Sequence, residues 1–293
     1  MNKWVEDIRL FDIAEGWDAP RETGRVVLEF KEGSGVFPLH GGMASLGFDR
    51  AGTRAFIKSN SVALALEIGS DGLKNLWGQP KRLLTYDTGG QRMLIHPTAD
   101  RLWTGDSVVE FSTGRELARI KRDVLKFYAA GTHVRVVWAA ENRVMEECRV
   151  ASKTEDDSDE YEVNQLILWN TETGEPVVDT PSPNGLCLSI SPDGATVAEG
   201  CSDMRVRFRN PKTLAVEREF RVHDSKVNAI DFHPARPILA TLGSTEARLW
   251  DLSDGRMLEE IRLRAGARSI AFLAGGRVLQ IEGMLFEPKC CMP

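Results

Sequence analysis

The chain has 293 residues, of which 42% are hydrophobic and 27% charged, and its formal net charge is −6. These values are typical of a soluble globular protein, and the acidic balance disfavours general binding to nucleic acid. No apolar run reaches the roughly 18 residues needed to cross a bilayer, and the N-terminal MNKWVEDIRLF lacks the apolar core of a secretory signal.

The five cysteines, at 148, 187, 201, 290 and 291, form no CxxC pair and no cluster with histidine. Structural metal sites and thiol redox centres are recognised by such spacings. We therefore predict free thiols in a reducing, cytoplasmic protein that carries no metal and no cofactor.

The first two predicted strands are Ile8–Ile13 and Arg25–Phe30. After them, strand-like segments recur at intervals of about 40 residues, with one interval near 60, which is the period of a propeller blade. The segments predicted to open each repeat are Met43–Phe48, Leu83–Asp87, Val124–Tyr128, Gly185–Ile190, Val227–Phe232 and Arg268–Phe272.

A second series of segments marks the third strand of each repeat. Trp169 and Trp250 occupy one position in this series, Phe11 and Phe111 are aligned with them, and Arg209 replaces the aromatic residue. The six copies lie at 8–13, 62–65, 108–111, 166–170, 206–210 and 247–252, with Ala65 at the aromatic position of the second.

An acidic insertion covers about 142–163, between the predicted second and third strands of the third repeat. Residues 153–162 carry six carboxylates and form the type of like-charge block that stays solvated. Asp156, Asp157 and Asp159 are candidates for docking a basic peptide, although the spacing is not that of an EF-hand loop.

The clearest repeat covers 221–263. Val227–Phe232 alternates apolar and polar residues, as a strand with two different faces does. A turn with two prolines, a short apolar strand and a strand that ends in Trp250-Asp251 follow, and His223 precedes the whole unit. This combination resembles one blade of the WD-repeat β-propeller family.

The resemblance implies that His223, Thr241 and Trp250 share a hydrogen-bond network inside the blade. Ser244-Thr245 occupies the turn where that family carries an aspartate, so the network appears incomplete in the sequence. By the same resemblance, the structural blade residues are His223, Thr241, Trp250, Asp251, Trp169, Phe11 and Asp12.

We therefore expect an all-β, WD-repeat-like propeller of four-stranded antiparallel blades in a single domain over 1–293. Six blades are counted, and seven are possible. The blades cover about 43–80, 81–122, 123–184, 185–224 and 225–265, and a composite blade joins 266–293 to 1–42. Closing the ring in this way removes exposed strand edges.

The expected function is a non-catalytic protein-interaction scaffold, in which one propeller face binds a partner protein or peptide within a larger assembly. No GxSxG, HExxH, Walker or GxGxxG motif is present, so we predict no enzyme. Position assigns the following residues to the binding face: His40, Trp77, Arg122, Asp156, Asp157, Asp159, Asp203, Asp224 and Lys226.

Two alternatives remain open. The chain could be a propeller enzyme, a hydrolase or lyase with a site in the central channel, which would need convergent polar groups or a metal. It could also be a purely structural subunit whose acidic 153–162 loop holds a basic neighbour. We expect neither nucleic acid nor a membrane among its partners.

Overall fold

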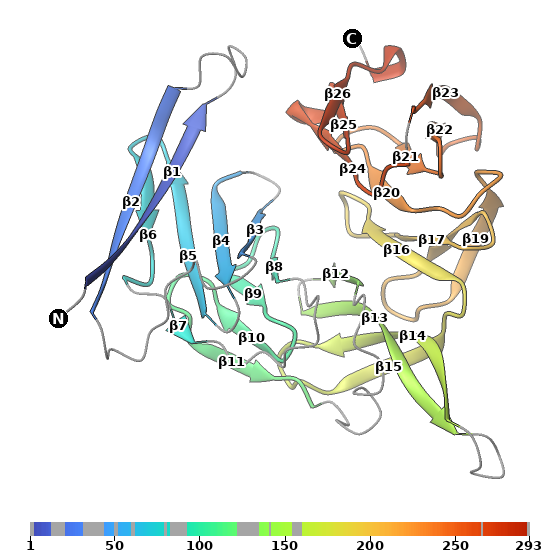
Figure 1. Ribbon diagram of the computed structural model, residues 1–293. Helices are drawn as coiled ribbons and strands as arrows, with labels where there is room; N and C mark the ends of the chain where they lie inside the picture. Colours follow the sequence, from blue (N-terminus) through green and yellow to red (C-terminus); the bar gives the residue numbers. More distant parts are fainter. Residues whose placement is uncertain are drawn as a thin grey trace. The chain divides into compact units, whose positions relative to one another are not determined.

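The regular structure of the chain is almost entirely β, as the computed structural model in Figure 1 shows. The structure describes residues 3–12, 21–31, 44–49, 52–59, 62–78, 81–82, 93–121, 135–140, 142–153, 160–264 and 266–291. Among these residues the helical elements are two short 3-10 turns, Ala274–Gly276 and Lys289–Cys291. The same residues contain no helix with the length and apolar character that crossing a bilayer requires.

Six antiparallel sheets form the blades of a β-propeller. In each sheet consecutive strands pair as a meander, except that β7 pairs with β5 in the first sheet. The first sheet holds β3 (Ala44–Phe48), β4 (Arg54–Ser59), β5 (Val62–Gly69), β6 (Gly72–Asn75) and β7 (Lys81–Arg82), and the second β8 (Leu94–Ile95), β9 (Arg101–Trp103), β10 (Ser107–Glu110) and β11 (Glu116–Arg119). The third holds β12 (Arg135–Ala140), β13 (Arg143–Lys153), β14 (Glu160–Asn170) and β15 (Pro176–Pro181).

The remaining three sheets follow in chain order. They are β16 (Gly185–Ile190), β17 (Val197–Cys201), β18 (Arg205–Arg209) and β19 (Val216–Arg221); β20 (Ala229–Phe232), β21 (Ile238–Leu242), β22 (Glu246–Asp251) and β23 (Met257–Arg262); and β24 (Ile270–Leu273), β25 (Val278–Ile281) and β26 (Met284–Phe286). The expectation of an all-β propeller with antiparallel blades is confirmed.

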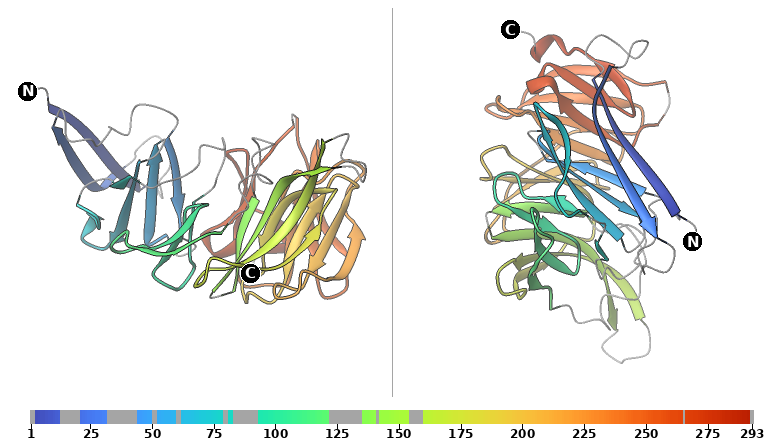
Figure 2. Two further views of the ribbon diagram at one scale, coloured as in Figure 1. Left: turned by 90° about the horizontal axis from the view of Figure 1, so that it is seen from below. Right: turned by 90° about the vertical axis from the view of Figure 1, so that its left-hand side faces the viewer.

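The chain divides into two compact units. Unit 1 contains the described residues up to 121 together with 171–174, and unit 2 contains the other described residues from 135 onward. In unit 2 the first strands β12, β16, β20 and β24 contact one another in series, as the inner strands of successive blades do. In unit 1 the hairpin of β1 (Lys3–Asp12) and β2 (Arg21–Lys31) contacts β6 (Figure 2).

Side chains between successive sheets of unit 2 make its core. Phe208 of β18 stacks on Phe220 of β19 at 5.6 Å, and Phe220 meets the edge of Trp250 at 5.6 Å. Val227 and Leu239 pack in the same cluster. Since each large apolar side chain contributes roughly 1.5–3 kcal/mol when buried, such clusters fix the spacing between neighbouring blades.

One turn design joins the first and second strands in four blades. The backbone N–H groups of Asp49, His96, Ser191 and His233 each donate to the carbonyl five residues later, at 2.9 Å. The side chain of each residue also accepts a backbone N–H inside its own turn. This shared turn identifies β3, β8, β16 and β20 as equivalent first strands.

The first described strands of the second and third sheets lie later in the chain than the two predicted segments. The ranges Leu83–Asp87 and Val124–Tyr128 lie outside the described residues, and the described sheets begin later in the chain, at β8 and β12. The signal was present in the sequence, because Ile95-His96-Pro97 repeats Phe232-His233-Pro234. The interval near 60 becomes shorter because β12 begins at Arg135, and the long β13–β14 hairpin accounts for the remaining excess over the other repeats.

The predicted composite blade would join strands of unit 1 to strands of unit 2, and it stays a prediction. Within the described residues, Phe11 belongs to the two-stranded β1–β2 sheet and Ile270 belongs to the three-stranded β24–β25–β26 sheet. Glu282 and Gly283 take φ values of 46° and 84° and turn the chain tightly back onto β25. A two-residue turn of this type needs positive φ at both positions and usually carries Asn, Asp or Gly at the first. Because Glu282 occupies that position, the sequence did not predict a third strand here.

Candidate interaction face

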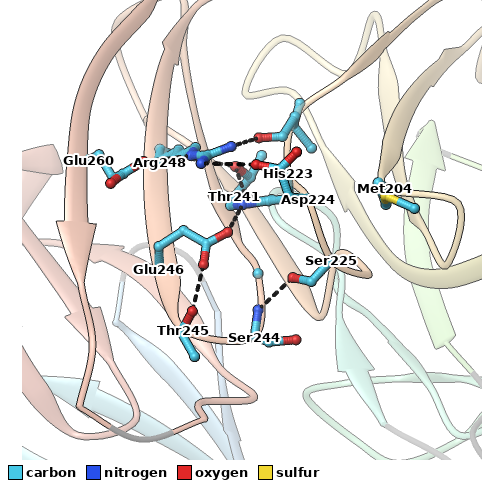
Figure 3. A network of polar contacts seen from close by, with 12 residues as sticks. Met204, His223, Asp224, Ser225, Thr241, Ser244, Thr245, Glu246, Arg248 and Glu260 are labelled. Carbon is cyan, nitrogen blue, oxygen red and sulfur yellow. Dashed lines mark hydrogen bonds and ion pairs between the residues drawn. The ribbon is translucent and has the colours of Figure 1, made fainter.

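A network of polar contacts in unit 2 lies at one end of the β20–β23 blade (Figure 3). His223 comes from the connection that leads into β20, and Thr241 lies in β21. Glu246 and Trp250 both lie in β22. Because β21 and β22 pair in antiparallel register, with Thr241 opposite Arg248, these side chains converge on one side of the sheet.

The network is a directed chain of hydrogen bonds. The Trp250 indole donates to the Thr241 hydroxyl at 2.9 Å, and that hydroxyl lies 2.9 Å from Nε2 of His223. His223 Nδ1 lies 2.8 Å from a carboxylate oxygen of Glu246. We assign the proton to Nδ1, since Nε2 can then accept from Thr241 while Nδ1 donates to the carboxylate.

Burial and charge act in opposite directions on this pair. His223 is 1% exposed, and burial lowers its pKa below the ordinary 6.5 although Glu246 opposes the shift. Burial raises the pKa of Glu246, but hydrogen bonds from His223 and Thr245 outweigh it and leave that pKa lowered. The result is a neutral imidazole hydrogen-bonded to an ionised carboxylate. Because the imidazole is buried, this arrangement suits a structural hydrogen bond better than proton transfer to a bound molecule.

Glu246 therefore supplies the carboxylate that the sequence appeared to lack. Sequence reasoning looked for an acid at Ser244-Thr245, where a short aspartate side chain would be needed. The longer glutamate reaches the same imidazole from the first residue of β22. The sequence signal for this role is the acid that directly follows Ser244-Thr245.

Hydrogen bonds from β22 and from the β21–β22 turn hold the connection that covers residues 222–226, in which Asp224 and Lys226 are exposed. Arg248 donates to the carbonyl of Val222 at 2.8 Å and pairs with Glu260 at 3.0 Å. Ser225 Oγ accepts the backbone N–H of Ser244 at 2.9 Å, as Figure 3 shows. The connection from 222 to 226 is thus fixed to β22 and to the β21–β22 turn.

Other blades fill the equivalent positions with different donors and acceptors. In the β12–β15 blade the indole of Trp169 donates to Glu146 at 2.8 Å. In the β16–β19 blade Arg209 pairs with Glu199 at 2.7 Å, and the hydroxyl of Ser182 donates to the same carboxylate. All five residues are buried: Arg209 is 6% exposed, and the other four are no more than 2% exposed.

The aromatic alignment at Phe111 needs correction. The N–H of Glu110 donates to the carbonyl five residues later, as the N–H of Asp251 does, so these two residues are equivalent. Val109 then corresponds to Trp250, and Phe111 lies two residues beyond the aromatic position. The buried Phe111 uses its carbonyl to accept the indole N–H of Trp77 at 2.7 Å.

The structure places the predicted binding residues in three groups. Asp224, with a side chain 80% exposed, and Lys226 lie on the exposed connection. Asp203 forms an ion pair with Arg207, and Trp77 is buried, with its indole engaged inside unit 1. The predicted binding residues outside the described part are His40, Arg122, Asp156, Asp157 and Asp159.

The remaining structural residues have mixed positions. Asp251 accepts the backbone N–H of Ser253 at 2.9 Å and so caps the β22–β23 turn. Phe11 and Asp12 end β1, opposite Glu22 and Arg21, and their side chains lie outside the description. In the described ranges no three histidine, cysteine or acidic side chains are grouped to hold a metal ion.

Comparison with known proteins supports the fold alone. No family model matches the chain, and no curated protein matches it. Among solved structures, the computationally designed protein Ika8 superposes with a TM-score of 0.54 at 14% identity, over 82% of this chain and 68% of that one. An identity this low indicates a shared architecture and carries no information on function.

Proposed function

We propose that the protein is a non-catalytic, WD-repeat-like interaction scaffold, and that it binds a partner protein through the loop face above the β20–β23 blade. We define this loop face by residues 222–228, 243–245, 263–264, 266–269 and 282–283. All of these connections lie at the end of the sheets that carries the His223 network.

The observation that carries the proposal is an exposed charged connection on a rigid base. Asp224 is held by Arg221 at 3.0 Å and by Arg248 at 3.7 Å, yet its side chain stays largely exposed. Pre-ordered side chains lose less conformational entropy when a partner binds. The side chains of the His223 network are already hydrogen-bonded to one another. We therefore assign them the role of supporting the connection and not of reacting with a bound molecule.

The state of the cysteines supports a cytoplasmic setting for this scaffold. All five are free thiols, and Cys148, Cys201 and Cys291 are buried. Burial raises the pKa of Cys201 to about 12, with the nearby Glu199 acting in the same direction. Such thiols are neutral and unreactive at physiological pH, as expected for structural cysteines in a reducing compartment.

Affinity purification with matched variants tests the proposal. Exchanging the charges at Asp224 and Lys226 (D224K with K226D) alters the loop face without altering net charge. The control exchanges Lys212 and Asp254 (K212D with D254K), which are exposed in turns at the opposite end of the sheets. We expect the first variant to lose partners that the wild type and the control retain.

Equal recovery of partners by both variants, at equal thermal stability, would contradict a binding role for this face. Stoichiometric calcium or zinc in the purified protein would instead favour a propeller enzyme.

A further inference from the structure

Hydrogen bonds join the neighbouring connections of the loop face. The N–H of Ser244 donates to Ser225 at 2.9 Å, and the N–H of Leu263 donates to the carbonyl of Thr245 at 2.8 Å. The β21–β22 turn is therefore bonded on one side to the connection before β20 and on the other to the connection after β23. Lys226 and Arg264 follow directly after these two contacts, so they flank the turn.

The carboxylates of the loop face and of the strand ends below it are already engaged. Asp224 pairs with Arg221 and Arg248, and Glu246 accepts from His223 and Thr245. Glu282 accepts the backbone N–H of Arg268 at 2.8 Å, which lowers its pKa. Each of these carboxylates is therefore already engaged within the protein, Asp224 by ion pairs and the other two by hydrogen bonds.

The cations of the loop face are not engaged in the same way. Lys226, Arg264 and Arg268 are exposed, and none forms an ion pair within 4 Å with another described residue. Glu282 acts on Arg268 only through space, because its oxygen contacts the backbone. The face therefore presents surplus positive charge on either side of an ordered turn, although the whole chain is negative.

We propose that the loop face recognises an acidic peptide segment of its partner, which lies across the β21–β22 turn with carboxylates toward Lys226, Arg264 and Arg268. This inference depends on the proposed function and specifies the chemistry of the partner. Electrostatic complementarity of this kind sets specificity and association rate. A nucleic acid fits less well, because bases bind by stacking on exposed aromatic rings. Among the described residues of this face, no large exposed apolar side chain is aromatic.

The test measures fluorescence anisotropy of labelled hexaglutamate against the full chain. We expect saturable binding at about 50 mM salt that is largely lost at about 500 mM, since screening at high salt removes interactions between exposed charges. Reversing two cations (K226E with R264E) should weaken binding about tenfold, because each exposed pair contributes a few-fold. The matched control (K212E with R256E) changes net charge by the same amount at the opposite end of the sheets and should bind within about twofold of wild type.

Three results would overturn the inference: no saturable binding, equal loss in both variants, or tighter binding of labelled oligothymidylate that K226E with R264E removes. Thermal unfolding of both variants checks that they remain folded. If K226E with R264E keeps the partners that D224K with K226D loses, the acidic-peptide inference fails while the proposed interaction face stands.

Discussion

Two neighbouring blades of unit 2 fill the same buried polar position with different groups, neutral in one blade and charged in the other. In the β20–β23 blade the buried centre is a hydroxyl, Thr241, which receives the neutral indole of Trp250. In the β16–β19 blade the equivalent centre is a carboxylate, Glu199, which receives the guanidinium of Arg209. Both third-strand residues directly follow a register shift against the fourth strand. Each also pairs with the second-strand residue that lies two positions before the acceptor, Leu239 for Trp250 and Val197 for Arg209.

The difference shows that the position requires a pair of roles and not particular residues. In these blades of unit 2 the third strand supplies a donor that points inward, and the second strand supplies the acceptor, whereas the β8–β11 blade of unit 1 has Val109 at the position of the donor. The β12–β15 blade mixes the two solutions, since Trp169 donates to Glu146. Buried polar groups are tolerated only when they are paired, so the donor and the acceptor must change together from blade to blade.

Breaking the charged centre should have the largest effect. We expect Arg209→Ala to lower the free energy of unfolding by about 3–5 kcal/mol, because it leaves an uncompensated buried carboxylate at Glu199. Arg209 also donates to the carbonyl of Leu214 at 2.8 Å, a bond that is lost with it. Urea unfolding followed by tryptophan fluorescence measures the change.

The control for this prediction removes both charges at once. Arg209→Met with Glu199→Leu keeps similar volumes and should recover most of the lost stability, as buried ion pairs replaced by apolar residues often do. A double variant as unstable as Arg209→Ala would show that the ion pair itself, and not the stranded charge, stabilises the blade.

The hydroxyl centre should be less costly to break. Thr241→Val preserves shape but removes the partner of both the Trp250 indole and Nε2 of His223. We expect a loss of about 2 kcal/mol, the cost of leaving buried neutral groups without a partner. Thr241→Ser retains the hydroxyl and should lose less than half as much; equal losses would locate the effect in the methyl group.

Sequence reasoning succeeded where local pattern and turn chemistry determine structure. Alternation predicted β20 within two residues, and the register confirms that Arg209 occupies the Trp250 position in its blade. The prediction failed where side-chain reach decides the partner, as with Glu246. It also failed at Phe111, because matching aromatic residues ignored the turn that fixes the true equivalence.

The chain ends were the hardest region to predict for a different reason. The described C-terminal sheet contains a strand that the sequence analysis missed, β26, which pairs with β25 through a local hairpin. A three-residue strand carries too little alternation to be recognised. By contrast, Asp224 and Lys226 were placed on an exposed connection by position alone, and the structure puts them there.

The turn between the third and fourth strands offers a smaller test of the same comparison. Gly255 takes a φ of 76°, and Leu214 takes 62° at the equivalent place in the neighbouring blade, with its side chain buried. A Cβ at Gly255 would meet nothing within 4 Å. Gly255→Ala should therefore cost about 1–2 kcal/mol of left-handed strain with no compensating contact, and a neutral result in urea unfolding would show that the turn can relax.

The smallest expected effect is a pH dependence of the free energy of unfolding that comes from His223 in the β20–β23 blade. His223 has a folded-state pKa below its ordinary 6.5, so the unfolded state binds the proton more tightly. The stabilisation from neutral His223 is complete above pH 6.5 and declines as the pH falls through the folded value. Glu246, whose pKa is also lowered, adds its own loss below its ordinary 4.5.

His223→Gln tests this assignment because glutamine keeps a donor and an acceptor but does not titrate. Between pH 7.5 and 5.5, wild-type stability in urea should fall more steeply than that of the variant. Arg248 carries a fixed positive charge near the imidazole and should accentuate the difference, since it disfavours the protonated ring. Parallel curves for the two proteins would mean that His223 keeps the same protonation in both states and that other groups account for the acid sensitivity.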